Sequence, residues 1–315
     1  MILAFDTSCY TTSVAVLAHD GRLLADKRRL LPVSKGACGL RQSAALFAHM
    51  QALPELLEQA LADSGALSIQ AVAFSSRPRP QPDSYMPVFL AGRQAGRLLS
   101  LAWACPCWDF SHQEGHIAAA AWSKALAWRE PFLAAHLSGG TGEILLACPQ
   151  EHGFSLEIMG GSDLPAGQFI DRVGVALGLP FPAGPALEQL ALSAKPAALR
   201  LKGTTKGAQM SFSGPESAAQ RLIAQGVDGA ALAQAVLANI GQSLSKALQA
   251  AAKASGCKQA LITGGVAANS LIRAQVEQEA PDLELHFALP AYAGDNAVGI
   301  ALLADKRLKQ GGVQI

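Results

Sequence analysis

The sequence predicts an α/β protein with two related lobes and a cleft between them. Strand-like and helix-like segments alternate along most of the chain. In addition, a strand, a small polar turn and a second strand occur at the start of the chain and again near residue 133, which indicates a duplicated unit. We therefore expect an N-terminal lobe over residues 1–130 and a C-terminal lobe over 131–315, with the last helix able to pack back on the N-terminal lobe.

Composition indicates a folded protein and excludes several classes. Half of the 315 residues are hydrophobic and 16% are charged, which excludes a disordered chain and allows each lobe its own core. The net charge of +1 predicts no strong overall field toward nucleic acid or a membrane, although a local basic patch is compatible with it. No apolar run reaches transmembrane length, and the six cysteines show no zinc-ribbon spacing. A cytoplasmic protein with reduced thiols is expected.

Apolar periodicity and turn residues place the elements of the N-terminal half. Strands are expected at Met1–Ser8, Ser13–Leu17, Leu23–Ala25 and Ala71–Ser75, and helices at 42–62 and 88–104. The prolines of Arg77–Pro87 exclude a regular helix or a central strand between the last two of these elements.

The C-terminal half repeats the alternation. Strands are expected at Phe132–Leu137, Glu143–Ala147 and Gln259–Thr263, and helices at 169–177, 185–192, 231–254, 269–279 and from Asp295 to about Lys306.

A pair of histidines gives the strongest chemical signal. His112 and His116 are four positions apart, so on a helix they share one face and can bind one divalent metal ion. Ser111 and Glu114 form a capping-box pattern, which predicts that this helix begins at the motif. The alternative is two ordinary histidines on a polar helix face.

Asp295 is the candidate third metal ligand, and it lies in the segment Ala293-Gly-Asp-Asn296 at the start of the predicted last helix. Two imidazoles and one carboxylate would leave coordination positions open, as in catalytic rather than structural sites. The alternative is that Asp295 caps the helix.

Small polar or glycine-rich turns follow three apolar strands, at Asp6–Ser8, Ser138–Gly142 and Gly264–Gly265. Such turns let backbone N–H groups approach phosphate oxygens, so together they favour nucleotide binding in the cleft, whereas each one alone is compatible with a tight hairpin. Asp6 is the candidate catalytic residue, suited to Mg²⁺ or a phosphate-bound water, and a turn cap is the alternative.

A metallopeptidase is excluded by the position of the glutamate. In H-E-x-x-H the glutamate follows the first histidine and stays near the metal, but Gln113 occupies that place here. Glu114 lies about 200° around the helix from His112 and points away from the metal face.

In their order along the chain these motifs resemble the TsaD family, also called Gcp or YgjD, whose members make threonylcarbamoyl-adenosine in tRNA. The similarity covers nearly the whole chain. It is carried by the segments Ile2–Cys9, His112–His116, Ser138–Gly140, Gly167–Asp171, Leu177–Pro185, Ser211–Gly214, Gly264–Asn269 and Asp295–Asn296.

The resemblance implies an ASKHA (actin, Hsp70, sugar kinase) fold of two ribonuclease-H-like lobes around a nucleotide and metal cleft. It implies one divalent metal, with iron, zinc and magnesium all compatible, at His112, His116 and Asp295, and ATP or an acyl-adenylate as the bound nucleotide. The implied nucleotide or substrate contacts are Ser138, Gly139, Gly140, Asp171, Gly184 and Asn269. In the family's reaction, N6 of a tRNA adenosine attacks the carbamoyl carbon of threonylcarbamoyl-adenylate, and AMP leaves.

Departures from the family pattern spare the implied metal ligands, lie around them and the nucleotide contacts, and favour a diverged paralogue. Cys9-Tyr-Thr-Thr12 stands where the family has Cys-Asp-Glu-Thr, Thr141 directly follows Gly140 where the family has a histidine, and Gln168 replaces a glutamate. The family's Gly-Pro-Gly-rich loop becomes Arg77–Pro87, in which Arg77 and Arg79 are candidate anion-binding residues, an exposed polar loop being the alternative.

Three functions therefore remain open. The chain is a threonylcarbamoyl transferase acting on tRNA with partner proteins, a related carbamoyl-type transferase with another acceptor, or a non-catalytic paralogue that serves as a nucleotide-binding or dimerising scaffold. Retention of all three metal ligands argues against the scaffold, and loss of the acidic pair after Cys9 argues against the first function in its strict form. The two transferase functions are therefore favoured together over the scaffold. A homodimer and a heterodimer with a family paralogue are both compatible with the sequence, which does not define the oligomeric state. tRNA is a candidate partner that the net charge does not support, and no membrane contact is expected.

Overall fold

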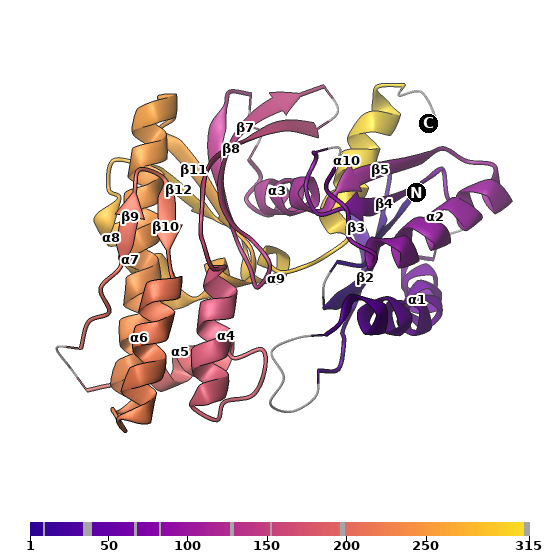
Figure 1. The fold of residues 1–315 in the computed structure, drawn as a ribbon. Coiled ribbons are helices and arrows are strands. Elements are labelled where there is room, and N and C mark those ends of the chain that lie inside the picture. The colour runs from indigo at the N-terminus through magenta and orange to yellow at the C-terminus, as the bar shows by residue number, and fades with distance from the viewer. Residues whose placement is uncertain are drawn as a thin grey trace.

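The computed structural model describes residues 1–8, 10–33, 40–65, 68–81, 83–126, 129–151, 153–195 and 199–311. It contains two five-stranded mixed sheets, in the strand orders β3-β2-β1-β4-β5 and β12-β11-β6-β7-β8, which lie in the two halves of the molecule (Figure 1). Cys9, in the opening motif, Cys38 and Pro82 lie outside the described residues.

The first sheet is built from the N-terminal part of the chain. Its strands are β1 (Ile2–Asp6), β2 (Thr11–Leu17), β3 (Leu23–Leu30), β4 (Ala71–Arg77) and β5 (Cys107–Ser111). β1, β2 and β3 are antiparallel, whereas β4 and β5 continue the sheet in parallel from β1. Helices α1 (Gln42–Ser64) and α2 (Phe89–Trp103) pack on one face through an apolar cluster that includes Leu3, Phe5 and Leu56.

The second sheet repeats this arrangement. Its strands are β6 (Phe132–Leu137), β7 (Gly142–Gln150), β8 (Gly153–Gly161), β11 (Gln259–Thr263) and β12 (Glu284–Phe287). β6, β7 and β8 are antiparallel, and β11 and β12 follow in parallel from β6. The two sheets thus share one connectivity, which confirms the predicted duplication and the α/β fold class.

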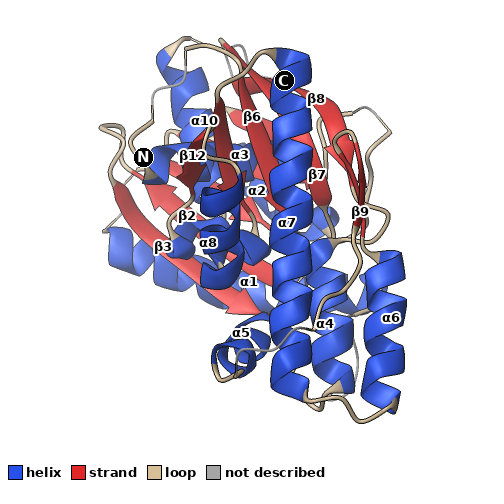
Figure 2. Cartoon of the chain, turned by 90° about the vertical axis from the view of Figure 1, so that its left-hand side faces the viewer, coloured by secondary structure: helices blue, strands red, loops and turns tan. Residues whose placement is uncertain are grey.

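Helices of the C-terminal half cover the second sheet and extend beyond it. The long helix α7 (Gly229–Ser255) runs along one face, as Figure 2 shows. The remaining elements are α4 (Ala166–Ala176), α5 (Gly184–Leu192), β9 (Thr204–Lys206), β10 (Gln209–Ser211), α6 (Ser213–Ala224), the 3-10 helix η1 (Gly265–Ala268), α8 (Ser270–Glu279), α9 (Pro290–Ala293) and α10 (Val298–Lys309). None of the described helices has the length and apolar character needed to cross a membrane.

Helix α3 (His112–Ser123) lies between the two sheets (Figure 1). Its Ala118 joins the cluster that α10 forms on the first sheet. Its Ile117, Ala120 and Ala121 join a cluster with β6, β7 and β11 of the second sheet. The last helix thus packs on the N-terminal lobe, and the helix that carries the histidine motif contacts both lobes.

The close approach of α3 to α10 depends on two glycines. A Cβ atom at Gly299 would lie 1.8 Å from the carbonyl oxygen of Gly115, and one at Gly115 would lie 2.9 Å from Cδ1 of Ile300. Gly299 has no room for a side chain unless a helix moves, whereas a side chain at Gly115 would require the Ile300 side chain to shift. The glycine between the two histidines therefore lets α3 pack closely against α10.

The structure confirms the expected helices, with bounds that shift by a few residues, and the absence of regular structure in residues 78–81 and 83–87 of the proline-rich segment. It also contains β5, β8, α6 and β12, which the sequence analysis did not predict. β12 is a short strand with mixed exposure, and α6 begins at Ser213-Gly-Pro, residues that weaken a helical signal.

The α3–α10 contact predicts the effect of adding one methyl group. Gly299→Ala places a Cβ against the backbone of Gly115, so we expect it to lower the free energy of unfolding by about 1–3 kcal/mol. The matched control is Gly214→Ala in α6, where a Cβ meets no atom within 4 Å. Urea unfolding measures both, and equal stability of the two variants would contradict the packing argument.

Candidate metal and nucleotide site

The first turn of α3 presents two imidazoles to the same point. Ser111 accepts a hydrogen bond from the backbone N–H of Glu114, and the Glu114 carboxylate accepts one from the backbone N–H of Ser111, at 2.8 Å, which confirms the predicted capping box. Because Glu114 caps the helix, it is not available as a general base. The exclusion of a peptidase therefore has a structural cause.

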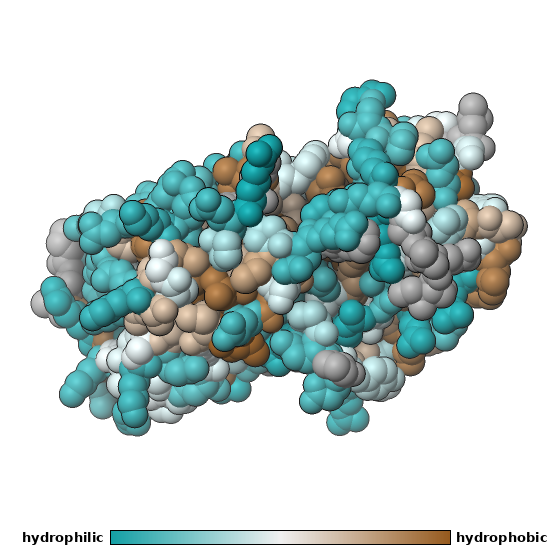
Figure 3. Space-filling view, turned by 90° about the horizontal axis from the view of Figure 1, so that it is seen from above, coloured by the Kyte–Doolittle hydropathy of each residue, from teal (hydrophilic) through white to brown (hydrophobic). Residues whose placement is uncertain are grey.

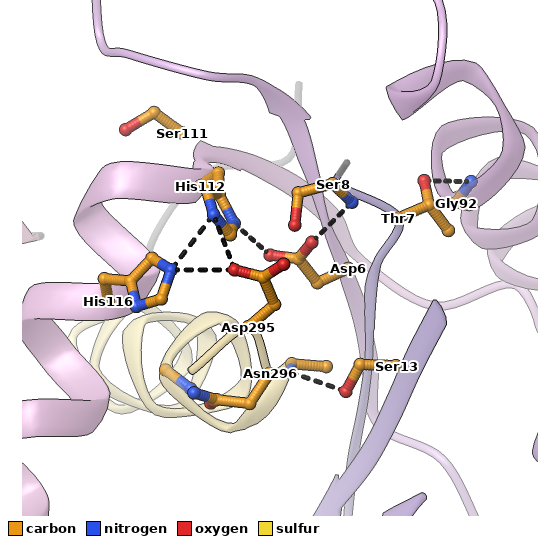
Figure 4. A network of polar contacts seen from close by, with 12 residues as sticks. Asp6, Thr7, Ser8, Ser13, Gly92, Ser111, His112, His116, Asp295 and Asn296 are labelled. Carbon is orange, nitrogen blue, oxygen red and sulfur yellow. Dashed lines mark hydrogen bonds and ion pairs between the residues drawn. The ribbon is translucent and has the colours of Figure 1, made fainter. Parts of the chain in front are cut away.

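Asp295 meets both histidines (Figure 4). The Nε2 atoms of His112 and His116 are 3.0 Å apart, and Oδ1 of Asp295 lies 3.4 Å from the first and 3.3 Å from the second. The structure thus brings together three residues from α3 and from the segment before α10. Imidazole nitrogens beside a carboxylate oxygen are a donor set that fits a divalent transition-metal ion.

Asp295 is available to the histidines because its neighbour caps the last helix. Oδ1 of Asn296 accepts hydrogen bonds from the backbone N–H groups of Val298 and Gly299 at the start of α10. The N–H of Ala297 donates to Oγ of Ser13 on β2, at 2.8 Å, which ties this segment to the first sheet. The capping role considered for Asp295 is thus carried by Asn296.

Asp6, at the end of β1, contacts the edge of the His112 ring opposite to Asp295. Its Oδ2 lies 2.7 Å from Nδ1 of His112, while Oδ1 accepts a hydrogen bond from the backbone N–H of Ser8. Asp6 is 1% exposed and does not line the cavity described below. From this position Asp6 is suited to orient the His112 ring and to cap the turn after β1, rather than to contact a substrate directly.

The charges of the cluster stabilise one another. Burial opposes a charge on His112, but the carboxylates of Asp6 and Asp295 outweigh it and raise the pKa of His112 to about 10. Burial also raises the pKa of both carboxyl groups, and the histidines more than offset this, so both pKa values fall below the usual range. Burial lowers the pKa of His116, and the neighbouring His112 lowers it further.

A third histidine, missed in the sequence, completes the group. One ring nitrogen from each of His112, His116 and His136 lies within 4.8 Å of the others. His136 is on β6 and is 1% exposed. The signal that could have found it is alternation, because His136 continues the face formed by Phe132 and Ala134 on a buried strand, where an apolar side chain is expected.

The candidate metal-binding group, made of His112, His116, His136 and Asp295, opens onto a cavity of about 720 Å³ between the lobes. His112 and Asp295 line it, whereas Asp6 and His116 lie behind its wall. All six residues predicted to contact a nucleotide or substrate also line it, namely Ser138, Gly139, Gly140, Asp171, Gly184 and Asn269. A size of this order suits a nucleotide or other cofactor.

Hydrogen bonds fix the shape of the cavity wall. Oγ of Ser138 accepts from the backbone N–H groups of Gly140 and Thr141, which closes the turn between β6 and β7. Oδ1 of Asn269 caps α8, and Oδ1 of Asp171 accepts from the N–H of Ala183 at 2.8 Å. Burial raises the pKa of Asp171.

Gly264, in the turn after β11, is required by the backbone. Its φ is +97°, and a Cβ there would lie 2.1 Å from the carbonyl oxygen of Leu137. The turn therefore packs directly on the end of β6, beside the Ser138 turn.

Comparison with known proteins agrees with this geometry. Residues 39–302 match the family described as TsaD, tRNA N6-adenosine threonylcarbamoyltransferase. A protein of that name from Thermus thermophilus is 33% identical over 98% of this chain and 94% of its own length, and one from Granulibacter bethesdensis is 32% identical over 99% and 90%.

The chain belongs to the TsaD family.

Solved structures of low sequence identity share the fold. The T. kodakarensis HypF structure has a TM-score of 0.65 at 14% identity, covering 99% of this chain and 48% of its own. Component A of the (R)-2-hydroxyglutaryl-CoA dehydratase from Acidaminococcus fermentans has a TM-score of 0.60 at 15% identity, over 98% of both chains. A ROK hexokinase from Thermus thermophilus has a TM-score of 0.51 at 16% identity, over 98% of this chain and 99% of its own. These likenesses confirm the predicted ASKHA fold.

The two candidate anion-binding arginines have different surroundings. Arg77 pairs with Asp109 on β5, at 2.5 Å, and does not line the cavity. Arg79 lines the cavity and pairs with Glu143 of β7, at 2.5 Å, and Glu143 also accepts a hydrogen bond from Gln113. Only Arg79 is therefore placed to meet a ligand in the cavity, and anion binding stays a prediction.

Several residues that depart from the TsaD pattern lie at the same cavity, whereas Gln168 does not. Tyr10 and Thr11, which stand where the family pattern is acidic, both line it. Gln168, on α4, accepts a hydrogen bond from Arg172 at the surface, at 3.4 Å. The cavity wall thus has fewer carboxylates than the family pattern predicts and includes an arginine.

The contact between Asp6 and His112 predicts a loss of metal affinity on neutralisation. Asp6→Asn keeps the size of the side chain but removes the charge that orients and polarises His112, so we expect Zn²⁺ to bind about 10–100-fold more weakly. Isothermal titration measures the affinity. Asp163→Asn, a hydrogen-bonded carboxylate near α6, is the control that should leave it unchanged.

The raised pKa of His112 predicts that metal uptake releases a proton. At pH 7 a group with a pKa of about 10 is protonated, and a metal ion must displace its Nε2 proton, whereas the lowered pKa of His116 leaves that ring neutral. We expect release of about one proton per ion, with affinity increasing about tenfold per pH unit. Titration in buffers of different ionisation enthalpy counts the protons, and a count of zero would contradict the charge assignment.

Proposed function

We propose that this chain transfers a threonylcarbamoyl group from an adenylate to N6 of a tRNA adenosine, with a divalent metal ion as cofactor. The observation that supports it most is that His112 and Asp295 and the six nucleotide-contact positions all line one cavity. TsaD-family relatives that match this chain over nearly their full length are named for this activity.

In this proposal His112, His116 and Asp295 hold the ion at the edge of the cavity. Asp6 retains the Nδ1 proton of His112, which directs the Nε2 lone pair toward the ion. When bound, the ion would act as a Lewis acid on the carbamoyl carbonyl. Iron, zinc and magnesium remain the candidate identities.

The opposite wall of the cavity would bind the adenylate or ATP. Gly184 and Pro185, at the start of α5, place a helix N-terminus at the cavity, where backbone N–H groups favour an anion. The first N–H groups of α8 instead donate to Glu188 and Asn269, so Asn269 would contact the ligand from the cavity wall rather than through a free helix end. The Ser138 turn presents further backbone to the same cavity. One structure of the same fold, a dehydratase activator, has bound ADPNP, which agrees with a nucleotide in this cleft.

A second candidate is the same transfer to a different acceptor. It is favoured by Tyr10, Thr11 and Arg79, which replace the family's residues on the cavity wall. The third reading, a non-catalytic scaffold, is disfavoured because the metal ligands are not only retained but oriented toward one another.

Association with a second copy of the chain or with a family paralogue stays a prediction, as does a cytoplasmic location. Apolar side chains that are exposed on α1 and α2 support an association, among them Phe47 at 64% and Leu101 at 75% exposed. In Figure 3 hydrophobic side chains reach the surface at the right-hand edge, the side on which α2 lies in Figure 1.

Complementation tests the proposed activity. The full chain is expressed in a bacterium depleted of its own threonylcarbamoyl transferase, and tRNA nucleosides are measured by mass spectrometry. We expect the modified adenosine to return with the wild type and with His19→Ala, an exposed histidine outside the cavity, and to be lost by at least 100-fold with His112→Ala.

Two other results would overturn this assignment. A protein that binds metal and adenylate but leaves tRNA unmodified would indicate another acceptor. A folded protein that binds neither would indicate the scaffold.

A further inference from the structure

His136 is a polar residue in an apolar stripe. On β6, the side chains of Phe132 and Ala134 face α3 and belong to its apolar cluster, whereas Leu133, Ala135 and Leu137 belong to the cluster on the other face of the sheet. His136 continues the first stripe at the level of the first turn of α3.

The His136 ring lacks hydrogen bonds. It is 1% exposed, and neither Nδ1 nor Nε2 has a hydrogen-bond partner among the described residues. Its neighbour in register on β7, Glu143, is already engaged by Arg79 and Gln113. A buried imidazole without partners is costly, so a native structure that keeps one calls for a ligand that satisfies it.

The ring lies beside the metal-binding group. The centroids of the His136 and His116 rings are 4.3 Å apart, and one nitrogen of His136 lies within 4.8 Å of those of His112 and His116. We propose that His136 is a fourth protein ligand, so that this chain binds its divalent ion through three imidazoles and the carboxylate of Asp295.

This ligand set selects among metal ions. Three nitrogen donors favour Zn²⁺ or Fe²⁺, whereas Mg²⁺ prefers an all-oxygen shell. His112 and Asp295 line the cavity, whereas His116 and His136 do not. An ion held by these four residues would therefore be accessible to a substrate from the cavity.

The fourth ligand also connects the two lobes through the ion. His136 belongs to β6 of the second sheet, His112 and His116 belong to α3, and Asp295 belongs to the segment that Ser13 anchors on the first sheet. Binding of the ion would therefore stabilise the packing of the two lobes against each other as well as the site.

Ligand counting by NMR tests the proposal without any assay of activity. The full chain is loaded with Co²⁺, and the hyperfine-shifted, solvent-exchangeable imidazole N–H protons are counted in the ¹H spectrum. We expect three such protons in the wild type and two in His136→Gln. A wild-type count of two would overturn the proposal even if the variant failed to fold.

Affinity provides the second readout. We expect His136→Gln to weaken Zn²⁺ binding at least tenfold, to reduce the preference for Zn²⁺ over Mg²⁺, and to leave the near-ultraviolet circular dichroism unchanged. His49→Gln, a change at another buried histidine that lies on α1, is the matched control and should leave Zn²⁺ affinity unchanged. A folded His136→Gln protein with wild-type affinity would contradict the assignment.

Discussion

The contact between α3 and α10 is the constraint on which the site depends. Gly115 and Gly299 bring the two helix backbones together without intervening side chains. Because Asp295 directly precedes the capped start of α10, and the two histidines begin α3, this single contact sets the distance between the carboxylate and the imidazoles. The core of both lobes reaches the same helix, so the site is assembled only when the lobes pack together.

Electrostatics gives this arrangement its chemistry. The group places two carboxylates and the imidazoles in a largely buried site, where each charge depends on its neighbours. Asp6 contacts Nδ1 of His112 and orients the ring, whereas Asp295 lies beside Nε2 on the opposite edge of the ring. A divalent ion bound at Nε2 would replace the proton there and would neutralise the carboxylate of Asp295 in its place. The group is thus suited to exchange a proton for a metal ion.

Much of this site could be predicted from sequence because its signals are local. The spacing of His112 and His116 implies one helix face, and the glycine turns follow recognisable strands. Asp295 was predicted from its position and from the family resemblance. His136 could not be found in this way, because a histidine in an apolar strand gives no ligand pattern until α3 is placed against β6.

The roles of the two arginines could not be predicted from sequence either. Arg77 and Arg79 belong to one proline-rich segment, but their partners Asp109 and Glu143 come from different sheets, and only the packing of the lobes separates their roles. The strands β5 and β12 were missed for a similar reason, since they are defined by pairing with neighbours distant in sequence.

The most direct measurement is an anomalous-scattering map of crystals grown with Zn²⁺ and a non-hydrolysable adenylate analogue. We predict one zinc peak within coordination distance of His112, His116, His136 and Asp295, with the analogue in the adjoining cavity beside the Ser138 turn. A zinc peak elsewhere, or an analogue bound outside the cavity, would contradict the joint metal and nucleotide site.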